Sequence, residues 1–110
     1  MRTILRSQEF DEFYASLSSP IQRKMDYALE VITTIKVVNQ KLIKKLIDSD
    51  FYELRINVGN EYRVILFTID KENFIEAEQI LLLNGFMKKS TKDYKREIAK
   101  AQSIIKQLSL

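Results

Sequence analysis

The residues best suited to chemistry are cations that recur through the second half of the chain. Arg55 and Arg63 stand inside two otherwise apolar runs, and Lys88 and Lys89 follow a glycine-phenylalanine pair. Three more basic side chains come directly afterwards: Lys92, Lys95 and Arg96. Fixed positive charges of this kind suit a polyanion, because a protein that neutralises phosphates releases condensed counterions. Nucleic acid is therefore the first ligand class to consider.

The chain of 110 residues contains neither histidine nor cysteine. This composition excludes disulfides and thiolate metal sites, and it removes the usual general base. Cleavage of RNA through its own 2′-hydroxyl needs neither a metal nor a water nucleophile, because positioning and electrostatic stabilisation supply most of the catalysis. Neighbouring cations also lower the pKa of a lysine toward a useful range. We expect no cofactor and no metal.

Tyrosines near these cations offer stacking platforms, which single-stranded RNA uses more than duplexes do. The candidates are Tyr52, Tyr62 and Tyr94. Structural roles compete with functional ones at each position. Tyr94 lies on the apolar stripe of its expected helix, and Tyr62 is equally suited to packing. The two readings stay open for both tyrosines.

The cations have structural alternatives as well. Arg63 could pair with Glu53 or Glu61 across a hairpin, and Arg55 could also form a structural ion pair, since such cross-strand pairs are ordinary. Lys88 and Lys89 could form a solvated edge that prevents sheets from associating. Lys95 and Arg96 are most simply the solvated face of a helix.

The overall composition predicts one compact domain over residues 1–110. Hydrophobic residues make up 45% and charged residues 30% of the chain, and the formal net charge is +3. This excess is small, so the placement of charge matters more than its sum. No apolar run is long enough to span a membrane, and the N-terminus has no signal-peptide pattern. We expect a cytoplasmic protein.

The cations must be positioned by a β-hairpin over Phe51–Phe67. Residues 51–58 alternate as a half-buried strand does, residues 58–61 form a tight turn around Gly59, and residues 62–67 are rich in β-branched and aromatic types. This pairing brings Arg55 and Arg63 together. A third strand is expected over residues 74–84, after which Gly85 turns the chain and Phe86 enters the core.

Helices are expected on both sides of these strands. Ser7 and Ser19 are candidate N-caps, the second followed by Pro20, and the two helices that begin there should form an antiparallel hairpin on the sheet. A short strand precedes them at residues 2–6. Residues 39–50 fit either a helical turn or an extended crossing. A last helix begins near Lys92 and turns an apolar stripe inward: Tyr94, Ile98, Ala101, Ile105 and Leu108.

The ordered motifs FYELRI, YRVILF, LLLNGFMKKSTK and KREIAKA resemble the RelE/ParE toxin superfamily over residues 41–108, nearest to its HigB-like, phage Gp49-type branch. The resemblance implies an α+β fold with an N-terminal helical hairpin on a small, twisted, mainly antiparallel sheet and a C-terminal helix. It also implies a type II toxin–antitoxin module with a cognate antitoxin, which we expect to be of the helix-turn-helix type. For the RelE and HigB branches it implies ribosome-dependent cleavage of mRNA.

The same resemblance assigns roles to individual residues. Arg63 matches a phosphate-binding arginine, and Arg55 matches a basic strand position. Lys88 matches a second cation that stabilises the transition state, and Lys89 is the neighbouring candidate for that role. Tyr94 matches a tyrosine with acid–base or stacking roles. The remaining expected RNA contacts are Lys92, Lys95, Arg96 and Tyr62. Two rival functions stay open, a ParE-like gyrase inhibitor without nuclease activity and a catalytically inactive, phage-type binding relative.

Overall fold

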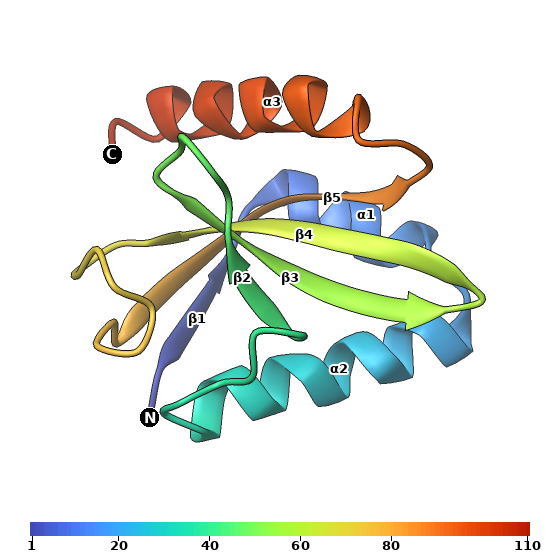
Figure 1. Cartoon of the computed structure of the whole chain (residues 1–110), viewed down its shortest axis with the longest axis horizontal. Coiled ribbons are helices and arrows are strands. Elements are labelled where there is room, and N and C mark those ends of the chain that lie inside the picture. Colours follow the sequence, from blue (N-terminus) through green and yellow to red (C-terminus); the bar gives the residue numbers. More distant parts are fainter.

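The computed structural model describes all 110 residues and contains one five-stranded sheet with the strand order β1-β5-β4-β3-β2 (Figure 1). β1 pairs with β5 in parallel, and the other three pairs are antiparallel. The expected mainly antiparallel sheet is therefore confirmed. The strands are β1 (Thr3–Arg6), β2 (Ile43–Lys45), β3 (Phe51–Val58), β4 (Asn60–Thr68) and β5 (Gln79–Lys88).

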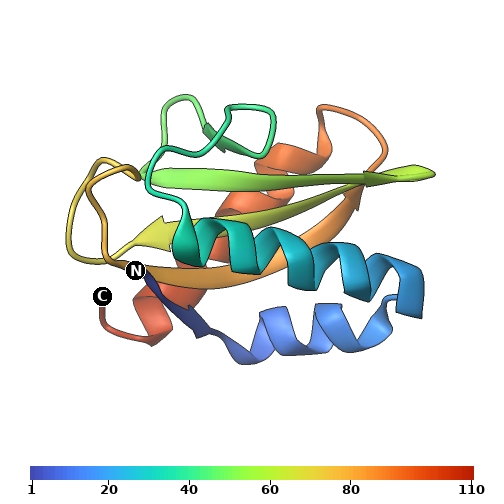
Figure 2. The ribbon, with the colours of Figure 1, turned by 90° about the horizontal axis from the view of Figure 1, so that it is seen from below.

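Three helices cover the two faces of the sheet. The helices are α1 (Gln8–Ser16), α2 (Ser19–Thr34) and α3 (Asp93–Gln107). Figure 2 shows α1 and α2 side by side and antiparallel on one face, with α3 behind the sheet on the other. Ser7 caps α1 as predicted, since its hydroxyl accepts the Phe10 N–H at 3.0 Å. The second cap is Ser18 rather than Ser19, so that Pro20 still falls in the first turn of α2.

The central hairpin agrees with its prediction. Phe51 pairs with Phe67 and Val58 with Asn60, so the turn contains Gly59 alone at a φ of +72°. This backbone conformation is accessible to glycine at little cost. Arg55 lies directly opposite Arg63. The pair therefore shares one face of the sheet, as the short turn required.

The strand predicted over residues 74–84 was wrong at both ends. Residues 74–77 form a turn that buries Phe74 and Ala77, and β5 begins at Gln79, whose N–H is bound by the Asp70 carboxylate. Gly85 does not turn the chain, because β5 continues to Lys88. The glycine is needed for close approach: a Cβ at position 85 would lie 2.2 Å from a ring carbon of Phe13 in α1.

Within residues 39–50 the extended part is β2 alone, with a turn before it, in which the Ile43 N–H donates to the Asn39 carbonyl, and a second turn after it. The segment thus contains both a helical turn and a strand, the two alternatives that the sequence left open. The structure contains no helix with the length and apolar character that crossing a membrane requires.

A β-bulge in β5 decides which side chains reach the α3 face. Ile65 pairs with Asn84 and the next residue, Leu66, pairs with Leu82, so Leu83 has no partner in the ladder. Leu83 packs among the apolar residues under α3, and Asn84 also bonds to α3. Such an extra residue shifts the alternation beyond it. Phe86 and Lys88 consequently face α3.

Candidate active site

A shallow hollow of about 380 Å³ lies on the α3 face of the sheet. β2 and the loop after it form one wall, β3 forms the floor, and the first turns of α3 form the other wall, together with the end of β5. Its charged lining consists of Lys44, Lys45, Glu53, Arg55 and Lys88, with Tyr94 beside them. The Lys45 ammonium points away from the hollow and lies 5.3 Å from the ring centroid of Tyr52, which packs on the α1 and α2 side. Three of the other four charges are positive, so the hollow suits an anion.

The Tyr94 hydroxyl is held between two buried groups. It donates to Glu53 Oε1 at 3.1 Å and accepts from Arg63 Nε at 3.1 Å. Its ring meets Phe86 edge-on at 5.6 Å, and Lys88 Nζ lies 5.7 Å from the ring centroid. Burial and the bond to Glu53 raise the pKa of Tyr94, although Arg63 opposes this. The phenol therefore keeps its proton at neutral pH.

Glu53 connects the site through a single carboxylate oxygen. Besides Tyr94, its Oε1 faces Arg55 Nε at 3.1 Å and Arg63 Nε at 3.5 Å. The second oxygen, Oε2, is buried without a hydrogen-bond partner. A carboxylate oxygen accepts hydrogen bonds through two lone pairs, so Oε2 is free to accept one.

Arg63 lies beneath the hollow with only 1% of its side chain exposed. Its guanidinium also bonds to Glu61 at 2.8 Å, to the Tyr62 carbonyl at 3.0 Å and to Asn57 at 3.4 Å. Both ion pairs considered from the sequence are therefore present. In this arrangement Arg63 supports Tyr94 from below, and direct contact with a phosphate requires the network to open.

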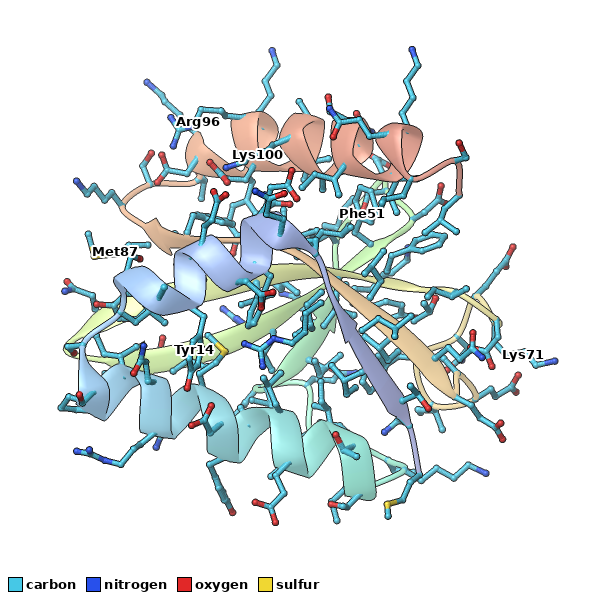
Figure 3. All side chains as sticks on the ribbon, turned by 180° about the vertical axis from the view of Figure 1, so that it is seen from behind. Tyr14, Phe51, Lys71, Met87, Arg96 and Lys100 are labelled. Atoms are coloured by element: carbon cyan, nitrogen blue, oxygen red, sulfur yellow. The ribbon has the colours of Figure 1, made fainter.

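One residue predicted to be catalytic, Lys89, and several predicted to bind RNA lie outside the hollow. Lys89, Lys92 and Lys95 are exposed but do not line it. Arg96, labelled on α3 in Figure 3, is 70% exposed and pairs with Asp93 and Glu97 at 3.3 Å each. They form a basic surface beside the hollow rather than part of it.

Tyr62 lies on the opposite face of the sheet. Because strand side chains alternate, its neighbour Arg63 faces α3 while Tyr62 is 8% exposed within the core under α1 and α2. Stacking on RNA at the hollow is impossible from this position. The structural reading of Tyr62 is the one that the fold supports.

The loop between β5 and α3 is fixed by Asp93. Its carboxylate accepts the N–H groups of Lys89 at 2.8 Å and Ser90 at 3.0 Å, and these bonds lower the pKa of Asp93. The loop therefore keeps Lys88 at the end of β5 and Tyr94 at the start of α3 in a defined relation.

Sequence reasoning did not place Lys44 or Glu53 in the site. Lys44 could not be placed, because the strand that directs it could not be distinguished from a helical turn. Glu53 stands two residues before Arg55, so strand alternation already placed both on one face. That spacing was the signal that could have identified the carboxylate.

The fold is that of the RelE toxins. A chain of the intact RelBE toxin–antitoxin complex of E. coli matches with a TM-score of 0.62 at 13% identity, over 82% of this chain and 100% of that one. A mutant E. coli RelE toxin in the free state matches with a TM-score of 0.61 at 16% identity, over 90% of this chain and 95% of that one. The RelB–RelE complex of Methanococcus jannaschii matches with a TM-score of 0.56 at 24% identity, over 82% of this chain and 96% of that one.

Residues 12–106 match the model of the family described as phage-derived protein Gp49-like (DUF891). The chain belongs to this Gp49-like family, which confirms the phage Gp49-type branch drawn from its motifs, and its fold is the RelE-like fold that the resemblance implied. No curated protein matches the sequence.

Proposed function

We propose that this protein is the toxin of a type II toxin–antitoxin module and cleaves mRNA on the ribosome as a metal-independent endoribonuclease. Family membership and the RelE-like fold support the toxin class. The observation that carries the nuclease assignment is the convergence in one hollow of Arg55, Lys88 and the hydrogen-bonded pair of Tyr94 and Glu53.

In the proposed reaction, Arg55 and Lys88 bind the scissile phosphate, and Lys44 binds the adjoining backbone. The charge that develops on the phosphoryl oxygens is then stabilised by groups already in place. Buried Arg63 adds a fixed positive charge beneath them without touching the substrate. Lys89, Lys92, Lys95 and Arg96 extend the basic surface toward the ribosome.

Proton transfer follows from the hydrogen bonds of Tyr94. The 2′-hydroxyl gives its proton to the phenolic oxygen while Tyr94 passes its own proton to Glu53 Oε1. The 2′-oxygen forms a bond to phosphorus, and the bond from phosphorus to the 5′-oxygen breaks. Lys88 protonates the departing 5′-oxygen. The products are a 2′,3′-cyclic phosphate and a 5′-hydroxyl, and exchange with water restores Glu53 and Lys88.

We further propose a cognate antitoxin as partner, of the helix-turn-helix type implied by the sequence motifs. The matched RelE structures from E. coli and M. jannaschii include complexes with RelB antitoxins, which supports a partner of this class. Because the proposed substrate is mRNA on ribosomes, the site of action is the cytoplasm.

The test is to add purified protein to mRNA with and without programmed ribosomes and to map the mRNA 5′ ends. The proposal expects codon-phased cuts that require ribosomes and leave 2′,3′-cyclic phosphates, the products of attack by the 2′-hydroxyl. Intact mRNA under these conditions contradicts the nuclease assignment. A parallel DNA-gyrase supercoiling assay then separates the two rival functions. A gyrase inhibitor inhibits supercoiling, whereas an inactive binding relative neither cleaves mRNA nor inhibits supercoiling.

A further inference from the structure

Asn84 is a buried polar residue that the proposed chemistry does not use. It is 1% exposed, and its amide nitrogen donates to the Glu97 backbone carbonyl at 3.1 Å and to Glu97 Oε1 at 3.1 Å. An amide NH₂ group has two hydrogens, so both are bound to α3. The amide oxygen of Asn84 is buried without a partner.

The β-bulge creates this contact. In a regular strand only one of two successive residues can face a given side. Here Leu83 enters the apolar cluster under α3, and Asn84 nevertheless reaches the same helix. The extra residue thus gives β5 both an apolar contact and a polar anchor on α3.

The anchor acts next to the functional tyrosine. Glu97 follows Tyr94 by three residues on α3, so the two side chains are neighbours on the helix surface. The C-terminal half of α3 is held by buried Ala101 and Ile104 in the apolar cluster. The N-terminal half lacks such a buried apolar side chain, since the buried residue there is Glu97.

Stability alone does not account for Asn84. A buried polar atom without a partner costs free energy, whereas an apolar residue of similar shape at this position would extend the cluster formed by Leu83 and Phe86. The amide differs from leucine in one useful respect: its hydrogen bonds are directional and define the position of the helix along and across the sheet.

We propose that Asn84 is a positioning residue that fixes the N-terminal half of α3 so that the Tyr94 hydroxyl stays on Glu53. The effect on RNA cleavage rests on the proposed function, whereas the effect on the placement of Tyr94 does not. The two parts can therefore be tested separately on the same variants.

The first variant is Asn84→Leu, which keeps the size and removes the anchor. Carbon-13 NMR of labelled tyrosine, with the Tyr94 signal assigned from Tyr94→Phe, follows its ionisation in the full-length protein. The variant should fold, and the pKa of Tyr94 should fall toward that of ordinary tyrosine as water enters and the Glu53 bond is lost. Asn39→Leu, at an exposed asparagine before β2, should leave the titration unchanged.

Activity gives the second readout. With programmed ribosomes, Asn84→Leu should lower kcat about ten- to a hundredfold, as a small displacement of a reacting group does. KM should stay unchanged, because Arg55 and Lys88 remain. Asn84→Ser keeps one hydrogen-bond donor and should fall between the leucine variant and the wild type. That graded order is not expected if the residue only fills space.

If Asn84→Leu does not fold, Glu97→Ala tests the same anchor from α3 and should shift Tyr94 in the same direction by less, since the backbone carbonyl remains. A wild-type Tyr94 titration in the folded variants overturns the proposal, whatever the activity. If the wild type cleaves no RNA, the proposed function fails, but the titration still decides the role of Asn84.

Discussion

The two faces of the sheet differ in the types of residue that they bury. Under α1 and α2, fourteen buried residues form an apolar cluster that includes Tyr62 as its only hydroxyl-bearing member. Under α3 the apolar cluster has eight residues, and four buried polar or charged side chains adjoin it: Glu53, Arg63, Asn84 and Glu97. The three other buried polar residues are Arg2, Ser7 and Thr68, and each donates hydrogen bonds to backbone carbonyls. The α3 face differs because its smaller core adjoins a charge network in which side chains bond to one another.

This difference separates stability from function within one sheet. Burial of apolar surface stabilises the fold, whereas a buried ion pair gains little because desolvation offsets the attraction. The charges under α3 are therefore poorly explained as stabilising elements. They are well explained as groups that hold Tyr94 and Arg55 in fixed positions at the hollow.

The largest expected effect is on stability when the network loses one charge. Arg63→Ala leaves Glu53 buried and short of a partner, so the free energy of unfolding should fall by about 3–5 kcal/mol. Denaturant titration measures this. Replacing both Arg63 and Glu53 by methionine should cost less than Arg63→Ala alone while still abolishing cleavage. A double variant that is less stable than the single one contradicts this view of the α3 face.

The next effect concerns activity. Tyr94→Phe removes the relay hydroxyl and keeps the ring on Phe86, so the single-turnover cleavage rate should fall about a hundredfold or more, as loss of acid–base catalysis does. Tyr62→Phe is the matched change on the other face, where the hydroxyl forms no hydrogen bond to the protein. It should cleave like the wild type, and a comparable loss would contradict the placement of the site on the α3 face.

A smaller effect is expected from close packing on the α1 side. Gly85→Ala places a methyl group against the Phe13 ring and should lower the free energy of unfolding by about 1–3 kcal/mol, as overpacking does. Phe13→Leu should recover part of the loss in the double variant. Equal stability of Gly85→Ala and wild type would mean that α1 moves away without cost.

The smallest effect is a pH dependence at the loop before α3. The Lys89 and Ser90 N–H groups lower the pKa of Asp93 in the folded state. Ionised Asp93 therefore stabilises the fold above the ordinary carboxyl pKa near 3.8, and this contribution is lost as the pH falls through the pKa of Asp93 in the folded protein. Asp93→Asn should therefore flatten the loss of stability below about pH 4. Thermal unfolding between pH 2 and pH 6 measures it, and an unchanged acid limb contradicts the assignment.

The sequence predicted the parts of the fold that follow from local pattern. Alternation located β3 and β4, the glycine turn set their register, and Ser7 marked the start of α1. The prediction failed at β5. The first residue of this strand is set by a hydrogen bond to Asp70 from the preceding turn, and Gly85 is required because the Phe13 ring lies against it. Both are tertiary contacts, and periodicity carries no information about them.

The same limit applies to the site. Strand spacing paired Arg55 with Arg63 correctly, but exposure could not be foreseen, so buried Arg63 and lining Lys88 looked alike. Lys88 and Lys89 are adjacent in the sequence, and only the unpaired Leu83 determines which of them faces α3. A bulge depends on how two strands pair, which a single strand does not show.

That last distinction supplies the most direct test of the account. The single-turnover rate of mRNA cleavage on programmed ribosomes should be measured for Lys88→Ala and Lys89→Ala, which remove the same charge from neighbouring positions. We predict a loss of about a hundredfold or more for Lys88→Ala, since electrostatic contacts to the transition state carry effects of this size, and less than about threefold for Lys89→Ala. Equal losses for the two variants would contradict the claim that the hollow under α3 is where RNA is cleaved.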